Sequence, residues 1–229
     1  MLTTANRKDI IESKKIICSE LAKIQKSFYD EEVEQYYKDQ GELSLFWEMY
    51  DCYNKEVLDY PVFHKVITIN HTQLESFTAT LTQKLTPLFE AINATDFIVV
   101  SHFKLDFFGN RDNDFVPLDA VYDELEKVVG GSKYNEAFKF NIHDLLKFVD
   151  IFFWITRCDP SAPEYIFLFD SKEQIQLNLC KYGNLHITEF NVERLTEDKL
   201  AKMGFSIITG PEFDNFDESG KIDGRVIEY

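Results

Sequence analysis

Residues 164–190, EYIFLFDSKEQIQLNLCKYGNLHITEF, decide the fold that we predict for this chain of 229 residues. The stretch contains three short runs rich in β-branched, aromatic and other apolar residues, at 164–169, 174–181 and 185–190. Turn-forming residues separate these runs, namely Asp170-Ser171 and Gly183-Asn184. This spacing predicts three adjacent strands of an antiparallel β-meander.

The second turn also predicts the register of the last hairpin. If Gly183-Asn184 forms a two-residue turn, Lys181 lies opposite His186. Side chains alternate between the two faces along a strand, so Cys180 and His186 would then point to opposite faces of the sheet. The predicted register therefore argues against a nucleophilic pair of Cys180 and His186.

The sequence on either side of the meander extends the β-rich region. Before it, residues 151–157, IFFWITR, have the composition of a further strand. After it, Thr196 begins a short helix that Gly204 closes, and strands are predicted at 205–209 and 226–229. We therefore expect residues 151–229 to be mainly β.

The first 150 residues are predicted to be mainly helical. Apolar residues recur at helical spacing from 6 to 38, with Asn6 as the cap, and again from 43 to 57, which together predict a helical hairpin. A further helix is expected from Thr72, which forms a capping box with Glu75, and Pro87 should kink or restart its last turn. Two more helices are expected, from 117 to 129 and from 142 to 150. Two strand-like runs interrupt them, at 62–69 and 96–103.

This order of elements predicts the fold class. Helices followed by a run of adjacent strands indicate an α+β fold in which helices cover one face of an antiparallel sheet. No linker rich in Gly, Pro or Ser divides the chain. We therefore expect a single domain over residues 1–229, with a mainly helical portion at 1–150 and a mainly β portion at 151–229.

The charge of the chain limits its partners. Asp and Glu number 40 and Lys and Arg 24, which gives a formal net charge of −16. Phosphate backbones and anionic membrane surfaces repel such a protein, so we expect neither nucleic acid nor a membrane as a direct partner. The same field attracts a basic macromolecule and speeds the encounter with it.

No motif for a cofactor or metal stands out. The four cysteines are far apart and form no CxxC pair, so reduced thiols are expected, and the histidines lack metal-site spacing. Asn110, Asp112 and Asp114 fit the start of a calcium loop, but Phe115 and Val121 occupy the positions that require Gly and Glu. Without a signal-peptide pattern or an apolar run near the ~20 residues that span a bilayer, the expected location is the cytoplasm.

Two segments concentrate the negative charge and contain aromatic residues. Residues 96–126 have eight acids and two bases, and residues 205–229 have six acids and two bases. An aromatic anchor beside a charged rim is typical of a protein interface. The residues that we expect to bind a partner are Asp106, Asp112, Asp114, Phe115, Tyr122, Asp123, Glu124, Asp214, Phe216, Asp217 and Glu218.

These observations lead to two hypotheses about function. The first is a binding module that occupies the basic active face of a toxin or nuclease, as a bacterial immunity protein or antitoxin would; a subunit of a larger assembly is a related interpretation. The alternative is an enzyme that acts on an anionic small molecule through residues gathered at the meander, namely Arg157, Cys158, Lys181, His186 and Glu189. A concave pocket at those residues would favour the enzyme, and a convex acidic surface would favour the binding module.

Overall fold

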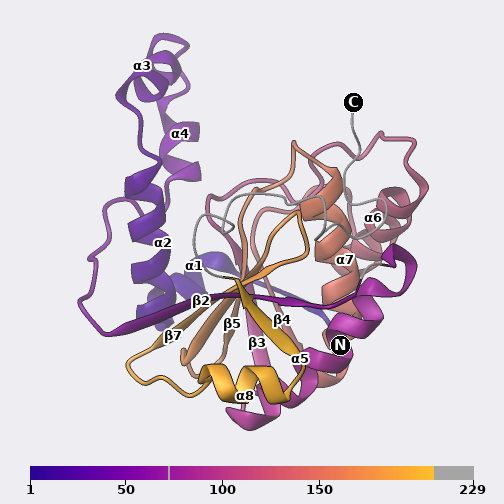
Figure 1. Ribbon diagram of the computed structural model, residues 1–229. Coiled ribbons are helices and arrows are strands. Elements are labelled where there is room, and N and C mark those ends of the chain that lie inside the picture. The colour runs from indigo at the N-terminus through magenta and orange to yellow at the C-terminus, as the bar shows by residue number, and fades with distance from the viewer. Residues whose placement is uncertain (72, 209–229) are drawn as a thin grey trace.

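A computed structural model describes residues 1–71 and 73–208, which form a single body built on one antiparallel sheet (Figure 1). Helices lie on both sides of this sheet, so the predicted α+β class is confirmed. Within the described residues, none of the helices combines the length and the apolar character needed to cross a membrane.

The sheet of the described residues has eight strands. They are β1 (Thr3–Ala5), β2 (Val62–Ile69), β3 (Asp96–Ser101), β4 (Ala137–Asn141), β5 (Ile166–Asp170), β6 (Ile175–Leu179), β7 (Leu185–Phe190) and β8 (Phe205–Ile208). Their order across the sheet is β1-β4-β3-β5-β6-β7-β2-β8, and every neighbouring pair is antiparallel. β1 and β8 therefore form the two edges.

The described part of the chain contains eight α-helices. They are α1 (Arg7–Ser13), α2 (Lys15–Ser27), α3 (Glu31–Asp39), α4 (Leu43–Met49), α5 (Phe77–Ala91), α6 (Val116–Val129), α7 (Leu145–Cys158) and α8 (Glu197–Lys202). Single turns of 3₁₀ helix precede α5 and α7, at Leu74–Ser76 and Ile142–Asp144.

The predicted meander is confirmed as β5, β6 and β7, but the predicted register of its second hairpin is wrong. Leu185 pairs with Leu179 and His186 pairs with Asn178, not with Lys181. The Cys180 N–H donates to the Asn184 carbonyl oxygen at 2.9 Å, so the turn begins at Cys180. This longer turn shifts the pairing, and the argument that separated Cys180 from His186 by face no longer applies.

The strand predicted at 151–157 is also wrong, because these residues belong to α7. Leu145, Phe148, Phe152 and Ile155 recur every three or four residues and are buried. A run that is apolar on all sides fits either a buried strand or a buried helix, and only its length separates the two. Here the run continues the helix that was expected to end at Asp150.

Helices cover both faces of the sheet, not one. In β3, Phe97 and Val99 pack into a core with α5, α6 and α7, whereas Ile98 and Val100 pack into a second core with α1 and α2. Every residue of β5 is buried as well. Strands that are apolar on both sides must be covered on both sides, which is why the one-face prediction failed.

The N-terminal region differs from its prediction in two ways. Asn6 caps α1 as expected, since its side chain accepts from the Asp9 N–H, but the expected long helix is divided at Lys14 and again at 28–30. The strands β1 and β4 were not anticipated, although β4 alternates buried and exposed residues at Phe138, Lys139 and Phe140. Four of the eight strands of the described residues thus lie in the region predicted to be mainly helical.

Of the local signals elsewhere, those at the two ends of α6 agree with the structure. α6 begins beside Pro117 and ends at Gly130, whose φ of 74° is left-handed and suits glycine. α5 contains Pro87 inside a continuous helix, where we expected a kink or a restart of the last turn. Thr72, the expected cap, and the strand predicted at 226–229 lie outside the described residues.

Candidate functional site

α3 and α4 form an arm, residues 30–49, that projects from the body beyond the end of α2 (Figure 1). Asp30 is the N-cap of α3, and its side chain accepts a hydrogen bond from the Glu32 N–H at 2.7 Å. Three glutamates in the first turn of α3 interact favourably with the helix dipole. Gly41, at a φ of 75°, turns the chain toward α4.

A small aromatic cluster holds the arm together, apart from the two cores of the sheet. Phe46 of α4 is buried, and its ring stacks on Tyr50 at 4.5 Å between centroids. Tyr37 of α3 contacts Phe46 at 5.7 Å, and Tyr29 contacts Tyr53 at 4.8 Å. The Tyr29 hydroxyl also donates to the Glu34 carboxylate, and this bond raises the pKa of Tyr29 to about 12. The arm therefore has a core of its own.

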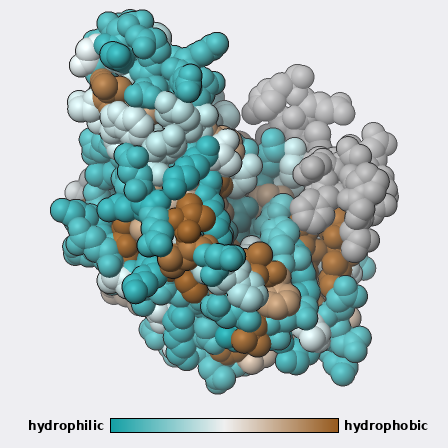
Figure 2. Space-filling model, turned by 90° about the vertical axis from the view of Figure 1, so that its left-hand side faces the viewer, coloured by the Kyte–Doolittle hydropathy of each residue, from teal (hydrophilic) through white to brown (hydrophobic). Residues whose placement is uncertain are grey.

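The outer surface of the arm is acidic and partly apolar. Residues 30–49 contain seven acids and one base. α3 buries none of its residues, Tyr36 is 62% exposed, and Leu45 of α4 is 50% exposed. Figure 2 shows mostly hydrophilic side chains over the end of the arm. An open hollow of about 510 Å³ lies along α3, lined by Glu31, Glu32, Gln35, Tyr36 and Asp39.

The base of the arm is fixed by an ion pair between buried Arg7 and partly buried Asp51. Arg7 of α1 is 1% exposed, and its guanidinium binds both carboxylate oxygens of Asp51, at 2.6 and 3.1 Å. The same guanidinium donates to the Ser101 carbonyl oxygen at 2.7 Å. Gln25 of α2 donates to Asp51 at 3.0 Å and accepts from the Cys52 N–H at 2.7 Å. The chain that follows α4 is therefore tied to α1, α2 and β3.

The acids predicted to bind a partner near α6 are partly engaged within the protein. Arg111 forms ion pairs with Asp119, Asp123 and Glu126 of α6, and its bonds to Asp119 and Glu126 raise the pKa of Arg111. Glu124 pairs with Lys127 and Lys147, and these bonds lower its pKa. Asp112 and Asp114 are exposed. Neither forms an ion pair with another of the described residues.

The remaining predicted residues have other environments. Asp106 accepts from the backbone N–H groups of Phe108 and Tyr134 and so shapes its own loop. Tyr122 is fully buried and donates to the Asp159 carboxylate, so its ring offers no surface to a partner. Phe115 is 39% exposed and meets Trp154 edge-on. Asp214, Phe216, Asp217 and Glu218 lie outside the described residues.

The residues of the enzymatic alternative are only partly brought together. Arg157 donates to the Lys181 carbonyl oxygen at 3.2 Å, and burial raises the pKa of Cys158. The Glu189 carboxylate is buried and accepts from the N–H groups of Arg194 and Leu195. His186 alternates with the core residue Ile187 and therefore points to the opposite face of β7 from Glu189.

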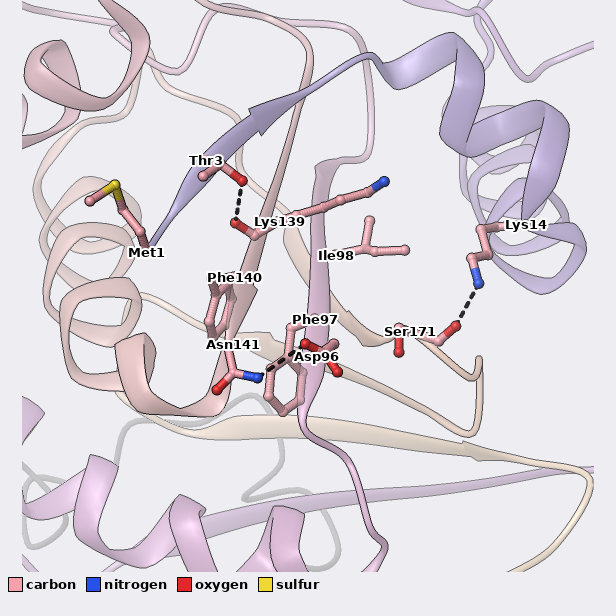
Figure 3. Close-up of a pocket in the computed structure, with 10 residues that line it drawn as sticks. All are labelled: Met1, Thr3, Lys14, Asp96, Phe97, Ile98, Lys139, Phe140, Asn141 and Ser171. Atoms are coloured by element: carbon pink, nitrogen blue, oxygen red, sulfur yellow. Dashed lines mark hydrogen bonds between the residues drawn. The ribbon is translucent and has the colours of Figure 1, made fainter.

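A second hollow, of about 390 Å³, lies where β1, β3 and β4 approach the loop after β5 (Figure 3). Several of the polar groups around it bond to one another. Asn141 donates to Asp96 at 3.1 Å, Lys14 donates to the Ser171 carbonyl oxygen at 2.5 Å, and Thr3 donates to the Lys139 carbonyl oxygen at 3.2 Å. These bonds join neighbouring segments, so we assign the hollow a structural role.

The arm was missed at the sequence level although its signal was present. Its acids were distributed over two expected helices, and the aromatic residues of 43–57 were assigned to one face of the second helix of the predicted hairpin. Eight acids in the 26 residues of 28–53 would have marked this segment as more acidic than either segment that was chosen.

Among residues 1–71 and 73–208, no group of three His, Cys, Asp or Glu side chains is arranged to hold a metal ion. In comparisons with known proteins, the chain matched no protein family, no curated protein and no solved structure.

Proposed function

We propose that this protein is a binding module for a basic protein and that the arm is its docking element. The observation that carries the proposal is the surface of α3. This helix buries none of its residues and presents carboxylates around the exposed ring of Tyr36. A stable fold seldom needs such an element, because most helices in proteins owe their stability to a packed apolar face.

The surface of the arm suits lysine and arginine side chains of a partner. The carboxylates of Glu31, Glu32 and Asp39 can form charge-assisted hydrogen bonds with them. The ring of Tyr36 lies beside these carboxylates and offers an aromatic face for a cation–π contact. Leu45 and Val33 add exposed apolar area on the same arm. An aromatic anchor within a charged rim is the usual composition of a binding hot spot.

This arrangement supports the inhibitor class of function that the sequence suggested. The acidic arm has the same sign of charge as the polyanion that a basic nuclease or toxin binds, so it could occupy the same site. Its projecting shape would allow it to enter a concave active face of the partner. An immunity protein or antitoxin would work in this way. The enzymatic alternative has less support from the described residues, because His186 and Glu189 face opposite sides of the sheet.

The test compares two variants of equal charge change. The arm variant carries Glu31→Gln, Glu32→Gln and Asp39→Asn, and the control carries Asp112→Asn, Asp114→Asn and Asp123→Asn. The partner is first captured with the wild-type protein from the cells that produce it, then purified for kinetics at several NaCl concentrations. We expect the arm variant to associate about tenfold more slowly and with a flatter salt dependence, because charged rim residues act mainly on the association rate.

The control should associate like the wild-type protein. If the control slows instead, the docking surface lies near α6 and not on the arm. A captured partner that is not basic, or association that neither variant changes, would contradict the proposed function.

A further inference from the structure

Two histidines from neighbouring strands meet on one face of the sheet. His64 lies on β2 and His186 lies on β7, which pairs with β2 (Figure 1). The centroids of their rings are 6.2 Å apart, and the ring planes are inclined by 37°. Because strand pairing brings the two residues together, no spacing within the sequence reveals them as a pair.

The register of the strands places both rings on the same face. His64 pairs directly with Thr188 of β7, and His186 lies two residues before Thr188 on that strand. Directly paired residues share a face of the sheet, as do residues two apart along a strand. His64 is exposed and His186 is partly buried, so solvent reaches the pair.

A hydrogen bond orients the ring of His64. Its Nδ1 and the Thr188 hydroxyl oxygen are 3.1 Å apart. When Nδ1 carries the proton and donates to this hydroxyl, Nε2 has the lone pair that a metal ion requires. Metal-binding histidines commonly have their second nitrogen held in this way. Thr188 is thus a positioning residue for His64.

An oxygen atom without a partner lies on the same face. Gln176 of β6 pairs with Thr188 from the side opposite to His64, so these side chains form one row across three strands. Within the described residues, Gln176 Oε1 is the buried side-chain atom that lacks a hydrogen-bond partner. Leaving a buried acceptor unbonded is unfavourable, so this oxygen calls for a donor or a cation that the described residues do not supply.

The separation of the two rings suits a shared metal ion. A ring nitrogen binds Zn²⁺ at about 2.0–2.1 Å, which puts the ion about 3.2 Å from the ring centroid. Two rings with centroids up to about 6.4 Å apart can therefore bind the same ion. The observed 6.2 Å lies within this limit. A movement of about 1 Å gives the tetrahedral arrangement that Zn²⁺ prefers.

We propose that His64, His186 and Gln176 bind a divalent transition-metal ion such as Zn²⁺. Two imidazole nitrogens and the amide oxygen take three coordination positions, and water completes the fourth. Mg²⁺ does not suit the site, because it prefers an octahedron of oxygen ligands.

The position of the ion gives it a structural consequence. Within the described residues, β8 pairs with β2 from Val66 to Ile69, so the end of β2 that carries His64 is paired with β7 alone. A metal ion would add a second link between β2 and β7 at this end. The site does not depend on the proposed function, since it lies on the sheet and requires no partner protein.

Protection from diethyl pyrocarbonate, which modifies imidazole rings, tests the site directly. His64, His186 and His143 fall in separate tryptic peptides with one histidine each, at 56–65, 182–194 and 140–147. The full chain is modified at pH 7 with and without ZnCl₂, and the peptides are quantified by mass spectrometry. We expect saturating Zn²⁺ to slow modification of His64 and His186 at least tenfold and to leave the exposed His143 unchanged. EDTA should abolish the protection, and MgCl₂ should give none.

Variants test each ligand through the Zn²⁺ concentration that gives half protection. In His64→Ala this concentration, followed at His186, should rise at least tenfold, and His186→Ala should have the same effect at His64. His143→Ala is the matched control and should behave like the wild-type protein. Gln176→Glu should lower the concentration about tenfold, because a carboxylate binds Zn²⁺ more strongly than an amide, and a merely structural role of Gln176 would not produce this change.

Three results would overturn the proposal. The first is equal protection of all three histidines, which would indicate scattered binding to the surface. The second is protection by Mg²⁺ as strong as that by Zn²⁺. The third is a half-protection concentration that His64→Ala leaves unchanged or that Gln176→Glu raises. Circular dichroism of each variant confirms that the fold is retained, and the comparison of histidines within the wild-type protein needs no variant at all.

Discussion

Arg7 and His102 are neighbouring basic side chains that are both buried, but their surroundings differ. Asp51 neutralises the charge of the buried Arg7 guanidinium through two hydrogen bonds. His102 lies near Arg7, and its ring nitrogen Nδ1 donates to the Tyr165 carbonyl oxygen at 3.2 Å. Burial lowers the pKa of His102 to about 4, and the charge of Arg7 adds to this effect. The imidazole is therefore neutral in the folded protein.

Because His102 is neutral in the folded protein, we predict that the protein loses stability in acid. Between pH 6.5 and pH 4 the unfolded chain binds a proton at His102 that the folded protein does not bind, so the free energy of unfolding falls as the pH falls. We expect this residue to cost about 2 kcal/mol between pH 7.5 and pH 5. Urea unfolding of the wild-type protein and of His102→Asn, which retains a donor near Nδ1, measures it. Equal losses in the two proteins over this range would show that His102 is not responsible.

The helices of the chain differ in how much they contribute to the stability of the whole fold. Removing their caps is a way to measure this difference. Asp30 caps α3, which buries no residue, and Asn6 caps α1, which buries Ile10 and Ile11 against the sheet. Loss of a cap destabilises a helix by about 1 kcal/mol. Only a helix that is packed into the core transmits this loss to global unfolding.

We therefore predict different results for Asp30→Ala and Asn6→Ala. Asp30→Ala should increase amide hydrogen exchange in residues 31–39 and leave the urea midpoint unchanged. Asn6→Ala should lower the free energy of unfolding by about 1 kcal/mol. A fall in the urea midpoint of Asp30→Ala as large as that of Asn6→Ala would mean that the arm is part of the global folding unit.

The same difference between local and long-range contacts explains what the sequence could predict. The cap at Asn6, the start at Pro117 and the stop at Gly130 were predicted because neighbouring residues set them. The hairpin register depended on whether the turn starts at Cys180 or Gly183, which tertiary packing decides. Residues 151–157 fit a helix or a strand equally well until the sheet beside them is known. The arm was missed because its apolar spacing resembles that of a core helix, and only the structure shows that α3 is not covered.

Acidic side chains outnumber basic ones in the whole molecule, and this excess should make its stability depend on salt. The formal net charge is −16, so the folded state is under net self-repulsion. The ion pair between buried Arg7 and partly buried Asp51 is less screened by salt than the exposed acids are. Raising the salt concentration should therefore remove more repulsion than attraction.

We predict that the free energy of unfolding rises by on the order of 1 kcal/mol between 20 and 200 mM NaCl, since screening relieves self-repulsion. Urea unfolding at both concentrations measures the change. Tetramethylammonium chloride should have the same effect, which distinguishes screening from binding of sodium. A decrease with salt would show that attractive surface ion pairs outweigh the net charge.

The order of strands across the sheet has a consequence for the time at which this protein can fold. β2 lies between β7 and β8, so a strand made early in synthesis has no neighbour until most of the chain has left the ribosome. β1 likewise waits for β4, and α1 and α2 wait for Phe167 of β5 and Phe190 of β7 before their second core closes. Such long-range pairing slows folding and leaves apolar surface exposed meanwhile. The nascent chain is therefore most vulnerable to aggregation before β7 emerges. The arm, whose aromatic cluster joins residues of 29–53, can form long before the body that carries it.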